Sequence, residues 1–293
     1  MTAELVARLV ALQFPQWSAL RVIPVAEDGW DNTTFRLGQE LAARLPSASA
    51  YEAQVAKEQR WLPFLAGKLP LTIPAPVAEG RPGAGFPRRW SVYRWLEGDR
   101  ATRDRVTDMS EVATALADFL VALRGVDAIG VPRPGMHNFF RGGAVATYDG
   151  EVRDAIDALG NRIDSRAALE VWDAALRTHW TGTPVWVHGD ISPDNLLLVG
   201  GRLAAVIDFG CCAAGDPACD LAIAYTFFDG NAREAFRDRV GLDSATWARA
   251  RGWALWKALI RLQAGRQGAA GTFDVRRVID EVVSEHKASQ SRV

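Results

Sequence analysis

The sequence predicts an α+β protein with two lobes, a small antiparallel β-sheet lobe followed by a larger, mostly helical lobe. Two observations carry this prediction. Up to about residue 96, short apolar runs rich in β-branched and aromatic residues alternate with turn-forming residues, which is typical of strands. Beyond that point, most apolar residues recur at helical spacing. We therefore expect residues 1–96 to form an N-terminal lobe and residues 97–293 a C-terminal lobe.

The composition indicates an ordinary globular protein with a small partner. Of 293 residues, 48% are hydrophobic and 24% are charged, which allows one or two domains with a large core. The formal net charge of -1 gives no basic field, so binding to nucleic acid is not expected as the main task. The sequence leaves the oligomeric state open.

Cysteine usage and apolar runs indicate a cytoplasmic location. Cys211, Cys212 and Cys219 form no CxxC pair, so we expect neither a zinc site nor a disulfide framework, but small buried side chains in a reducing compartment. No run of about 18 apolar residues is present, so no membrane span is expected. The first residues lack the basic start and apolar stretch of a signal peptide.

The chain is expected to open with a helix that ends near Pro15. Its apolar face would consist of Leu5, Val6, Leu9, Val10 and Leu12. Strand-like segments follow at residues 21–27, 34–37 and 40–46, and residues 27–34 form a polar loop between the first two. This loop contains Gly29 as its one glycine, so it can be a plain hairpin connection or a cover over phosphates.

The third of these strands carries a cation on one face. Alternation places Leu41, Ala43 and Leu45 on one side and Ala42 and Arg44 on the other. Arg44 therefore either points into a site or is a solvated arginine of an edge strand.

The N-terminal lobe is completed by a helix and a buried strand. Residues 51–70 show a buried side of Val55, Trp61 and Leu62 and end as a helix near Gly67. Glu52 and Glu58 lie on this helix, and either can be an ordinary surface acid. Residues 90–96 form an apolar strand that leads into Glu97 and Gly98.

The second lobe is expected to be built from helices. Residues 109–126 have a helical apolar pattern, with Ser110 as the cap and Gly125 as the stop. Residues 127–150 are rich in glycine and proline and are expected to form a loop. Further helices are expected at residues 152–159, 166–180 and 244–267, and the segment after Asp216 begins with a turn and becomes an apolar helix.

Residues 185–210 concentrate polar side chains between apolar runs. A strand at 185–187 leads into the turn-forming residues His188, Gly189 and Asp190. Two apolar runs then flank Gly200 and Gly201, a pair that suits the positive φ angles of a tight hairpin turn. Because a hairpin returns the chain, Asp190, Asn195 and Asp208 should converge at one end of it.

These three residues suit a reaction that uses a divalent cation. Asn195 and Asp208 offer oxygen ligands, which Mg²⁺ prefers, and Mg²⁺ fills its remaining positions with phosphates and water. Asp190 is then left to orient a hydroxyl group and accept its proton. The alternative for each residue alone is a turn former or a strand-end cap.

The motif resembles those of kinases. The spacing HxDxxxxN at residues 188–195, followed by Asp208-Phe209-Gly210, is that of the catalytic and metal loops of protein kinases. The HGD form and the sequence GDPACDLA, with Asp216 and Asp220, resemble the aminoglycoside phosphotransferase family, which has macrolide and choline kinase relatives. The resemblance extends from Val22 to about Phe228.

The resemblance implies a protein-kinase-like fold and the transfer of the γ-phosphoryl group of ATP or GTP to a hydroxyl of a small molecule, with Mg²⁺. His188 and Asp190 would belong to the catalytic loop, and Asn195 and Asp208 would bind the metal. Asp220 would hold the His188 loop by backbone hydrogen bonds.

The resemblance also implies a nucleotide site in the first lobe. Arg44 stands where kinases place a lysine, and Glu58 would be its acidic partner. The implied phosphate-side donors are Asn32, Thr33 and Thr34. After Tyr93, the Arg94 carbonyl and the Leu96 amide would contact the base.

The C-terminal helix argues against a polycationic acceptor. Residues 244–273 contain no acid, but three tryptophans and the cations Arg249, Arg251, Lys257, Arg261 and Arg266. Such a helix suits a neutral or weakly charged hydroxylated ligand, unless Asp154, Asp157 or Asp229 lines the same cleft. The tryptophans Trp247, Trp253 and Trp256 can equally be core residues.

Two other functions are compatible with the same residues. One is a metal-dependent hydrolase that uses Asp190, Asp194 and Asp208 and needs no nucleotide. The other is a kinase-like binding module without turnover, whose usual sign, the loss of the base or of a metal ligand, is absent from this sequence.

Overall fold

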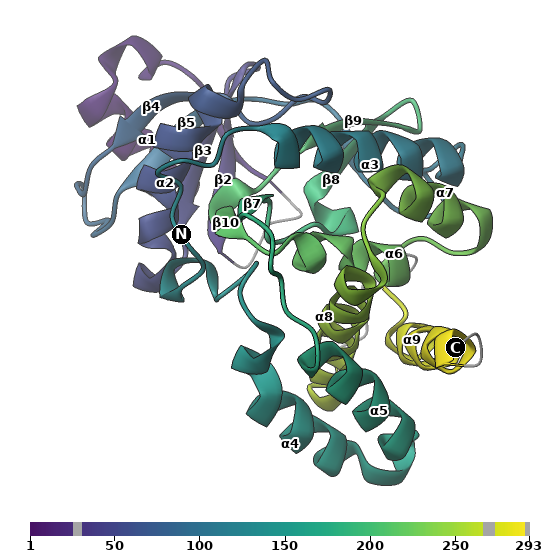
Figure 1. Ribbon diagram of the computed structural model, residues 1–293. Coiled ribbons are helices and arrows are strands. Elements are labelled where there is room, and N and C mark those ends of the chain that lie inside the picture. Colours follow the sequence, from purple (N-terminus) through teal and green to yellow (C-terminus); the bar gives the residue numbers. More distant parts are fainter. Residues whose placement is uncertain (26–30, 266–272, 291–293) are drawn as a thin grey trace. The chain divides into compact units, whose positions relative to one another are not determined.

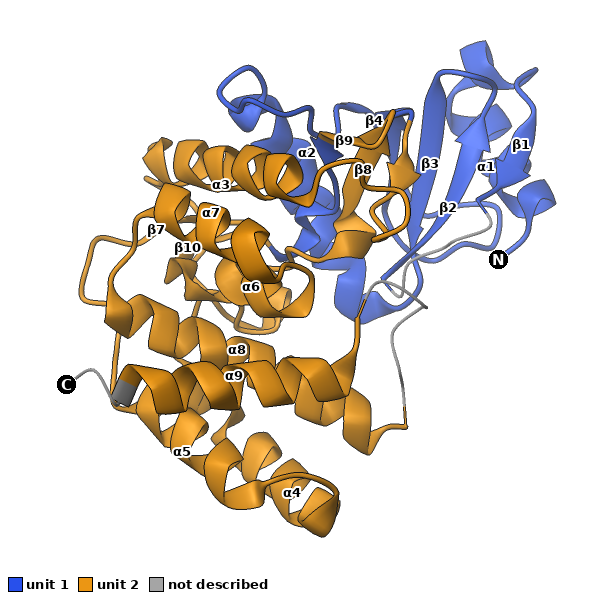
Figure 2. Ribbon diagram, turned by 90° about the vertical axis from the view of Figure 1, so that its right-hand side faces the viewer, with its two compact units in different colours: residues 1–97, 205–211 blue, residues 98–204, 212–293 orange. Residues whose placement is uncertain are grey.

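A computed structural model describes residues 1–25, 31–265 and 273–290 (Figure 1). The described chain forms two compact units, shown in different colours in Figure 2. Unit 1 comprises Met1–Glu97 and Ala205–Cys211, and unit 2 comprises Gly98–Ala204 and Cys212–Val293. A late segment that contains Asp208 thus belongs to unit 1. Gly29 and Arg266 lie outside the described residues.

Unit 1 contains the antiparallel sheet that the sequence predicts. Its order is β1-β2-β3-β5-β4, and each neighbouring pair is antiparallel. The strands are β1 (Val22–Pro24), β2 (Asn32–Leu37), β3 (Leu41–Pro46), β4 (Pro76–Gly80) and β5 (Trp90–Arg94). The expected strand to Leu96 is too long, because β5 ends at Arg94.

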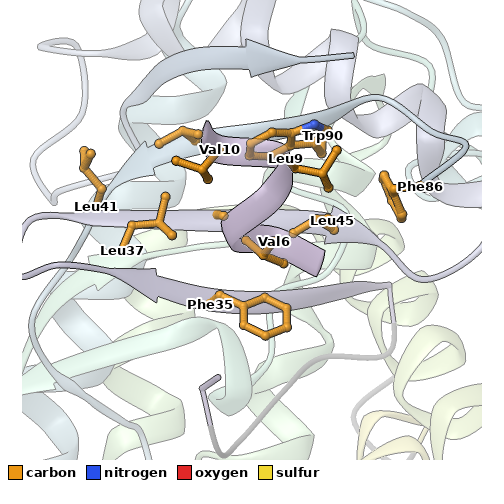
Figure 3. Packing of buried hydrophobic residues seen from close by; sticks show 11 residues of the cluster. Val6, Leu9, Val10, Phe35, Leu37, Leu41, Leu45, Phe86 and Trp90 are labelled. Carbon is orange, nitrogen blue, oxygen red and sulfur yellow. The ribbon is translucent and has the colours of Figure 1, made fainter. Parts of the chain in front are cut away.

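One face of this sheet packs against helix α1 (Ala3–Gln13), as Figure 3 shows. Val6, Leu9 and Val10 of the helix are buried there against strand residues that include Phe35 and Trp90. The expectation that Leu12 shares this face is wrong, since Leu12 is 69% exposed. At about 100° per residue, position 12 lies about 160° around the helix from Val10 and about 120° from Val6.

The other face of the sheet carries polar residues and lies under α2 (Glu52–Leu65). On β5, alternation sends Trp90 and Val92 toward α1, so Ser91 and Tyr93 point the other way. Gln59 and Glu58 of α2 hydrogen-bond to Ser91 and Tyr93, respectively. Helices α1 and α2 therefore cover opposite faces, and Arg44 lies on the α2 face. Short 3₁₀ turns occur at Pro15–Trp17, Ser49–Tyr51 and Phe209–Cys211.

Unit 2 is mostly helical, as predicted. Its helices are α3 (Met109–Gly125), α4 (Asp149–Leu159), α5 (Ser165–Leu176), α6 (Ile223–Thr226), α7 (Gly230–Val240), α8 (Ser244–Gln263) and α9 (Val275–Gln290). Helix α8 packs against α4, α5 and α9, and Figures 1 and 2 both show it beside α9. Trp247, Trp253 and Trp256 of α8 are buried, so the tryptophan series belongs to the core.

Small strands of unit 2 frame its loops. Strand β7 (Val185–Val187) pairs with β10 (Ala213–Gly215). Strands β6 (Asp99–Arg100), β8 (Leu196–Val199) and β9 (Arg202–Val206) form a second sheet in the order β6-β8-β9, and the final residues of β9 belong to unit 1. At the turn between β8 and β9, both Gly200 and Gly201 have the expected positive φ angles, 58° and 78°.

Several helix ends differ from the prediction. The cap of α3 is Asp108, whose carboxylate accepts hydrogen bonds from the N–H groups of Ser110 and Glu111. Asp108 and the predicted cap Ser110 both stand at the start of the helical pattern, and aspartate is as good an N-cap residue as serine. The helix expected at residues 166–180 ends at Leu176, and the sequence did not indicate α7 or α9.

The residues after Asp216 form a tighter coil than expected. Pro217–Ala222 is a 3₁₀ helix, and the following α6 spans one turn. Within residues 127–150, expected to be a loop, there are 3₁₀ turns at Met136–Asn138 and Val145–Tyr148, and α4 already starts at Asp149. Two further 3₁₀ turns lie at Gly160–Arg162 and Pro193–Asn195. None of the helices in the described ranges combines the length and hydropathy that crossing a bilayer needs.

Candidate active site

In unit 2, strand β7 delivers the chain into the loop that carries His188 and Asp190. Trp186, Val187 and His188 are fully buried, so the loop starts from the core. Asp220 accepts hydrogen bonds from the backbone N–H groups of His188 and Gly189, both at 2.8 Å. Gly189 has a φ of 86°, a left-handed conformation that glycine adopts without strain. The buried Asp220 thus fixes the turn that precedes Asp190, as the resemblance implied.

Asp216 and Asp220 divide two tasks between them. The carboxylate that caps the 3₁₀ helix is that of Asp216, which accepts from the N–H of Ala218 at 3.0 Å. Asp220 serves the His188 loop instead. Burial raises the pKa of Asp220 more than the His188 charge and the two N–H donors lower it.

Asp190 is a partly exposed carboxylate held next to a cation. Its side chain is 41% exposed, and Oδ1 lies 3.3 Å from Nζ of Lys257 on α8. Burial would raise the pKa of Asp190, but the charges of Lys257, Arg141 and His188 outweigh it and lower the pKa below the usual value. The carboxylate is therefore ionised at neutral pH, as a proton acceptor must be.

Asn195 is oriented by the backbone of the same loop. Its Nδ2 donates to the Asp190 carbonyl oxygen at 2.8 Å and lies 3.4 Å from Asp190 Oδ2. Because both neighbours of the amide nitrogen are acceptors, the orientation of the amide is fixed. The structure thus places Asp190 and Asn195 side by side in unit 2.

The ring of His188 also has a structural partner in the loop. The Asp190 N–H donates to His188 Nδ1 at 3.2 Å. His188 is fully buried, so its contribution is to shape the loop.

In unit 1, Arg44 bridges two acids. One guanidinium nitrogen, Nη2, lies 3.1 Å from Asp208 Oδ1, and the other, Nη1, lies 3.5 Å from Glu58 Oε1. Burial disfavours the charged guanidinium, but Asp208 and Glu58 more than compensate and raise the pKa of Arg44. The planar fork of arginine suits this double contact better than the single ammonium of lysine.

Glu58 has a second partner that the sequence did not indicate. The Tyr93 hydroxyl donates to Glu58 Oε2 at 2.5 Å. Burial and the Glu58 charge raise the pKa of Tyr93 well above its usual value, so the phenol keeps the proton that it donates. Tyr93 therefore locks the carboxylate that faces Arg44.

Asp208 has an unusual backbone conformation. Its φ is 67°, in the left-handed region that residues other than glycine rarely adopt, although aspartate tolerates it better than most. Two residues later, Gly210 packs against α2, and a Cβ there would lie 2.5 Å from Oε1 of Gln54. Such strain persists only where the surroundings enforce it, and it concentrates at functional sites.

The proposed nucleotide residues lie at two ends of strand β3. At one end, Asn32 pairs with Pro46 and Thr34 with Arg44, while at the other end Leu41 pairs with Arg94. Arg44 is three positions along the strand from Leu41, which corresponds to a distance of about 10 Å. Thr33, between Asn32 and Thr34, belongs to the first end, and Leu96 follows β5 at the second.

The side chain of Arg94 is directed to a surface partner. It lies 3.2 Å from Glu40, and both side chains are exposed. The next amide, that of Trp95, donates to the Glu40 carbonyl at 2.7 Å. Only backbone atoms of this segment were expected to contact a base.

The cations of α8 are distributed differently from the expectation. Arg249 is buried and paired with Asp216 at 2.6 Å, and Arg251 is buried and paired with Glu285 at 2.8 Å. Both arginines thus have acidic partners within the protein, and Lys257 is paired with Asp190. The acids named as possible counterparts also differ: Asp154 and Asp157 are exposed on α4, and Asp229 is paired with Arg103.

No group of three or more histidine, cysteine, aspartate or glutamate side chains could hold a metal ion within the part of the chain that the structure describes. The hydrolase alternative, which uses Asp190, Asp194 and Asp208 together, has no such cluster to support it. A site of one carboxylate and one amide with phosphate oxygens does not depend on such a cluster.

Comparison with known proteins gives one family match. The model of the phosphotransferase enzyme family matches residues 22–253. No curated protein sequence matches the chain.

Solved structures share the fold across nearly the whole chain. The GDP and kanamycin complex of APH(2")-IIia has a TM-score of 0.71 and 21% identity, and the match covers 97% of this chain and 98% of that one. For the streptomycin-ATP-APH(2")-IIa ternary complex, the TM-score is 0.61, the identity 19% and the coverage 89% and 90%. The match to macrolide 2'-phosphotransferase MphH from Brachybacterium faecium has a TM-score of 0.58 and 22% identity, and it covers 95% of this chain and 97% of that one.

Proposed function

Because the chain belongs to the phosphotransferase enzyme family, we propose that it transfers the γ-phosphoryl group of ATP or GTP to a hydroxyl group of a small molecule. The observation that carries the proposal is Asp190, an ionised and partly exposed carboxylate at the end of a loop that buried groups hold rigid. Proteins of the same fold occur in complexes with GDP and kanamycin and with streptomycin and ATP.

Asp190 would act as the base. Its carboxylate would accept a hydrogen bond from the acceptor hydroxyl, orient that oxygen toward the γ-phosphorus and take its proton as the new O–P bond forms. Asp220 and His188 would contribute by holding the loop. Such positioning accounts for much of the catalysis in phosphoryl transfer.

Asn195 and Asp208 would hold Mg²⁺. Both provide oxygen atoms, and in the sequence one precedes β8 and the other follows β9. Asp208 also faces Arg44, which counters the same negative charge in the absence of a metal. When bound, Mg²⁺ would neutralise charge on the phosphates.

The nucleotide would lie along the β3 side of unit 1. Arg44, kept in place by Glu58, and the donors Asn32, Thr33 and Thr34 would bind phosphate oxygens. The backbone at Arg94 and Leu96 would bind the base. The separation of these two groups along the strand agrees with a ligand that has its base and its phosphates at opposite ends.

The acceptor would not be a polycation. A polyamine needs several carboxylates, since unpaired ammonium groups are costly to desolvate, and the group that reaches Asp190 from α8 is itself a cation, Lys257. We also propose a reducing, cytoplasmic setting, because Cys211, Cys212 and Cys219 are buried and none of them forms a disulfide bond.

A pair of variants tests the role of Asp190. Asp190→Asn should abolish the release of nucleoside diphosphate (ADP or GDP) that alcohols and sugars stimulate. The rise in Tm on addition of nucleotide and Mg²⁺ should stay as in the wild type. Asp194→Asn is the matched control, because Asp194 is an exposed aspartate in the same loop. Full activity of Asp190→Asn would refute the assignment, and equal loss in Asp194→Asn would show that the loss is not specific to the base. Metal-dependent turnover without nucleotide would favour the hydrolase alternative.

A second pair tests the metal ligands. Asn195→Ala and Asp208→Ala should each raise the Mg²⁺ concentration needed for half-maximal turnover. The effect of Asp208→Ala should be larger, because that side chain carries a charge. Unchanged activity of Asp208→Ala at ordinary Mg²⁺ would show that this carboxylate is not a ligand.

A further inference from the structure

Arg141 in unit 2 has donors that no protein group uses among the described residues. Its guanidinium carbon lies 4.3 Å from the ring centroid of Trp256, 5.5 Å from that of Trp253 and 5.9 Å from that of Tyr148. Nε and Nη1 are buried and lack a hydrogen-bond acceptor in the same ranges. Contact with ring faces stabilises the charge but leaves the in-plane N–H groups without acceptors.

The segment of Arg141 is packed against the catalytic loop. The next residue, Gly142, approaches β7 so closely that a Cβ there would lie 2.9 Å from Cγ2 of Val187, the residue before His188. The Gly142 carbonyl oxygen accepts from the N–H of Asp216 at 2.7 Å. Consistent with this position, the charge of Arg141 lowers the pKa of Asp190.

The backbone before Arg141 is held in a costly conformation. Phe139 and Phe140 have φ angles of 52° and 54°, so two consecutive bulky residues are left-handed. The buried Asn138 enforces this turn, because its Nδ2 donates to the Arg141 carbonyl at 2.9 Å and its Oδ1 accepts from Gly135 N–H at 3.0 Å. The surrounding structure thus enforces a strained backbone at the two residues that precede Arg141.

Lys257 brings a second cation to the same place. It follows Trp256 on α8, whose ring Arg141 covers, and its Nζ lies 3.3 Å from Asp190 Oδ1. An ammonium has three donors, of which Asp190 takes one. Arg141 and Lys257 thus come from distant parts of the chain, and the charges of both lower the pKa of Asp190.

The acids nearby have other partners. Asp216 is paired with Arg249, and Glu151 accepts from Trp256 Nε1 at 2.9 Å. Asp149 binds Arg153 and Trp172. None of these contacts involves Arg141, whose Nε and Nη1 lack an acceptor among the described residues.

We propose that the acceptor of this phosphotransferase carries an anionic group, a carboxylate or a phosphate, and that Arg141 and Lys257 bind this group while Asp190 binds the hydroxyl. The proposal rests on the proposed function, because Asp190 marks the position of the hydroxyl. Arg141 would supply a fork of N–H donors to two oxygens of the anion, and Lys257 a point charge. Arg141 is then a specificity residue for the acceptor and plays no part in binding the nucleotide.

The test uses compounds that share a scaffold and differ in charge. Glucose, glucuronate, glucose 6-phosphate and glucosamine form one series, and glycerol, glycerate, glycerol phosphate and aminopropanediol a second. Ligand-observed NMR measures the binding of each compound in the presence of a non-hydrolysable nucleotide and Mg²⁺. A coupled assay measures the release of ADP or GDP. We expect the anionic members to bind and react best, and comparison of carboxylate with phosphate identifies the source of the anion.

Arg141→Gln should remove this preference. The Kd or KM of the best anionic compound should rise about 10- to 100-fold, as for loss of a hydrogen bond to a charged group, while the KM of the nucleotide stays unchanged. Arg141→Lys should restore part of the affinity. Arg166→Gln, at an exposed arginine paired with Glu170, is the control and should have no effect.

The outcomes separate this proposal from the proposed function. If an anionic compound binds in a way that depends on Arg141 but no ADP or GDP is released, the anion site is supported. The same result would count against phosphotransfer to these compounds. Efficient turnover of a polyamine such as kanamycin would overturn the anion site and leave phosphotransfer standing. No binding of any anionic member at millimolar concentration, or equal binding by glucosamine, would also overturn the proposal.

Discussion

At the scale of single residues, the charge state of Asp190 depends on its cationic neighbours. Burial raises its pKa, but the charges of Lys257, Arg141 and His188 lower it, with a net shift below the usual value of aspartate. A carboxyl group whose pKa is lowered in the folded state stabilises the fold above its unfolded pKa, and this contribution is lost as the pH falls through the folded pKa. The base should therefore stay ionised down to unusually acidic pH.

Lys257→Gln should shift this titration upward. Without the ammonium, which is the strongest of the lowering charges, the pKa of Asp190 should move toward or above the ordinary value of about 3.9. Carboxyl-detected NMR titration, with the Asp190 signal assigned by its absence in Asp190→Asn, measures the shift directly. A lower or unchanged pKa in Lys257→Gln would contradict the electrostatic role of Lys257.

Arg44 should matter for the stability of unit 1 as well as for nucleotide binding. Its side chain is 16% exposed, and its removal would leave Glu58 and Asp208 without their cation. We expect Arg44→Met to lower the free energy of unfolding by about 3 kcal/mol, the lower end for a broken buried pair.

Arg94→Met is the control for this measurement. Arg94 is an arginine of the same sheet, but it is 59% exposed and paired with the exposed Glu40. Its replacement should cost less than about 0.5 kcal/mol. Urea unfolding without nucleotide compares the two variants, and equal losses would show that the Arg44 bridge does not stabilise the fold.

At the scale of elements, the turn between β8 and β9 connects the two proposed metal ligands. Gly201 has a φ of 78°, and a Cβ there would lie 2.4 Å from Cγ2 of Thr107 and 3.1 Å from the Arg105 carbonyl oxygen. Gly200 has a φ of 58°, but a Cβ at this position would meet no atom of the described residues within 4 Å. Strain therefore affects both positions, and steric overlap affects Gly201 alone.

The two glycines should respond differently to substitution. Gly200→Ala should cost roughly 1 kcal/mol, the penalty of a left-handed alanine, and Gly200→Asn less, because asparagine tolerates this region. Gly201→Ala should cost at least about 2 kcal/mol, because the overlap with Thr107 adds to the same penalty. Urea unfolding of the three variants gives the order, and equal costs for the two alanines would contradict it.

The elements also show where sequence patterns suffice. Strand β7, the glycine turn and the antiparallel sheet follow from local spacing and turn chemistry, and the sequence predicted them. The pattern failed where several residues could serve equally well. Asp108 caps α3 in place of Ser110, and Leu12 is exposed although it is an apolar residue of α1. These choices depend on what packs beside the helix end.

At the scale of the whole molecule, residues of a local sequence motif and of each unit have partners that lie far away in the sequence. His188, Asp190, Asn195 and Asp208 lie within one short segment, so their spacing alone indicated their chemistry. Lys257 reaches Asp190 from 67 residues away, and Tyr93 reaches Glu58 from 35 residues away. No periodicity encodes such contacts, because they depend on how helices and strands pack. The same holds for Arg249, a cation of α8 that the sequence placed near a ligand and that is buried against Asp216.

Nucleotide binding should stabilise the whole chain in a way that separates the base from the metal ligands. A ligand that binds only the folded state at 100 times its Kd adds about 2.7 kcal/mol to the free energy of unfolding, which is several degrees in Tm for a chain of this size. Mg²⁺ with nucleotide should raise the Tm above the value measured with nucleotide and EDTA. If Asp208 binds Mg²⁺ and Asp190 binds only the acceptor, this additional rise in Tm should vanish in Asp208→Asn and persist in Asp190→Asn. Differential scanning fluorimetry with ATP and with GTP measures these increments and the nucleotide preference. An Mg²⁺ increment that survives in Asp208→Asn but is lost in Asp190→Asn would reverse the two roles.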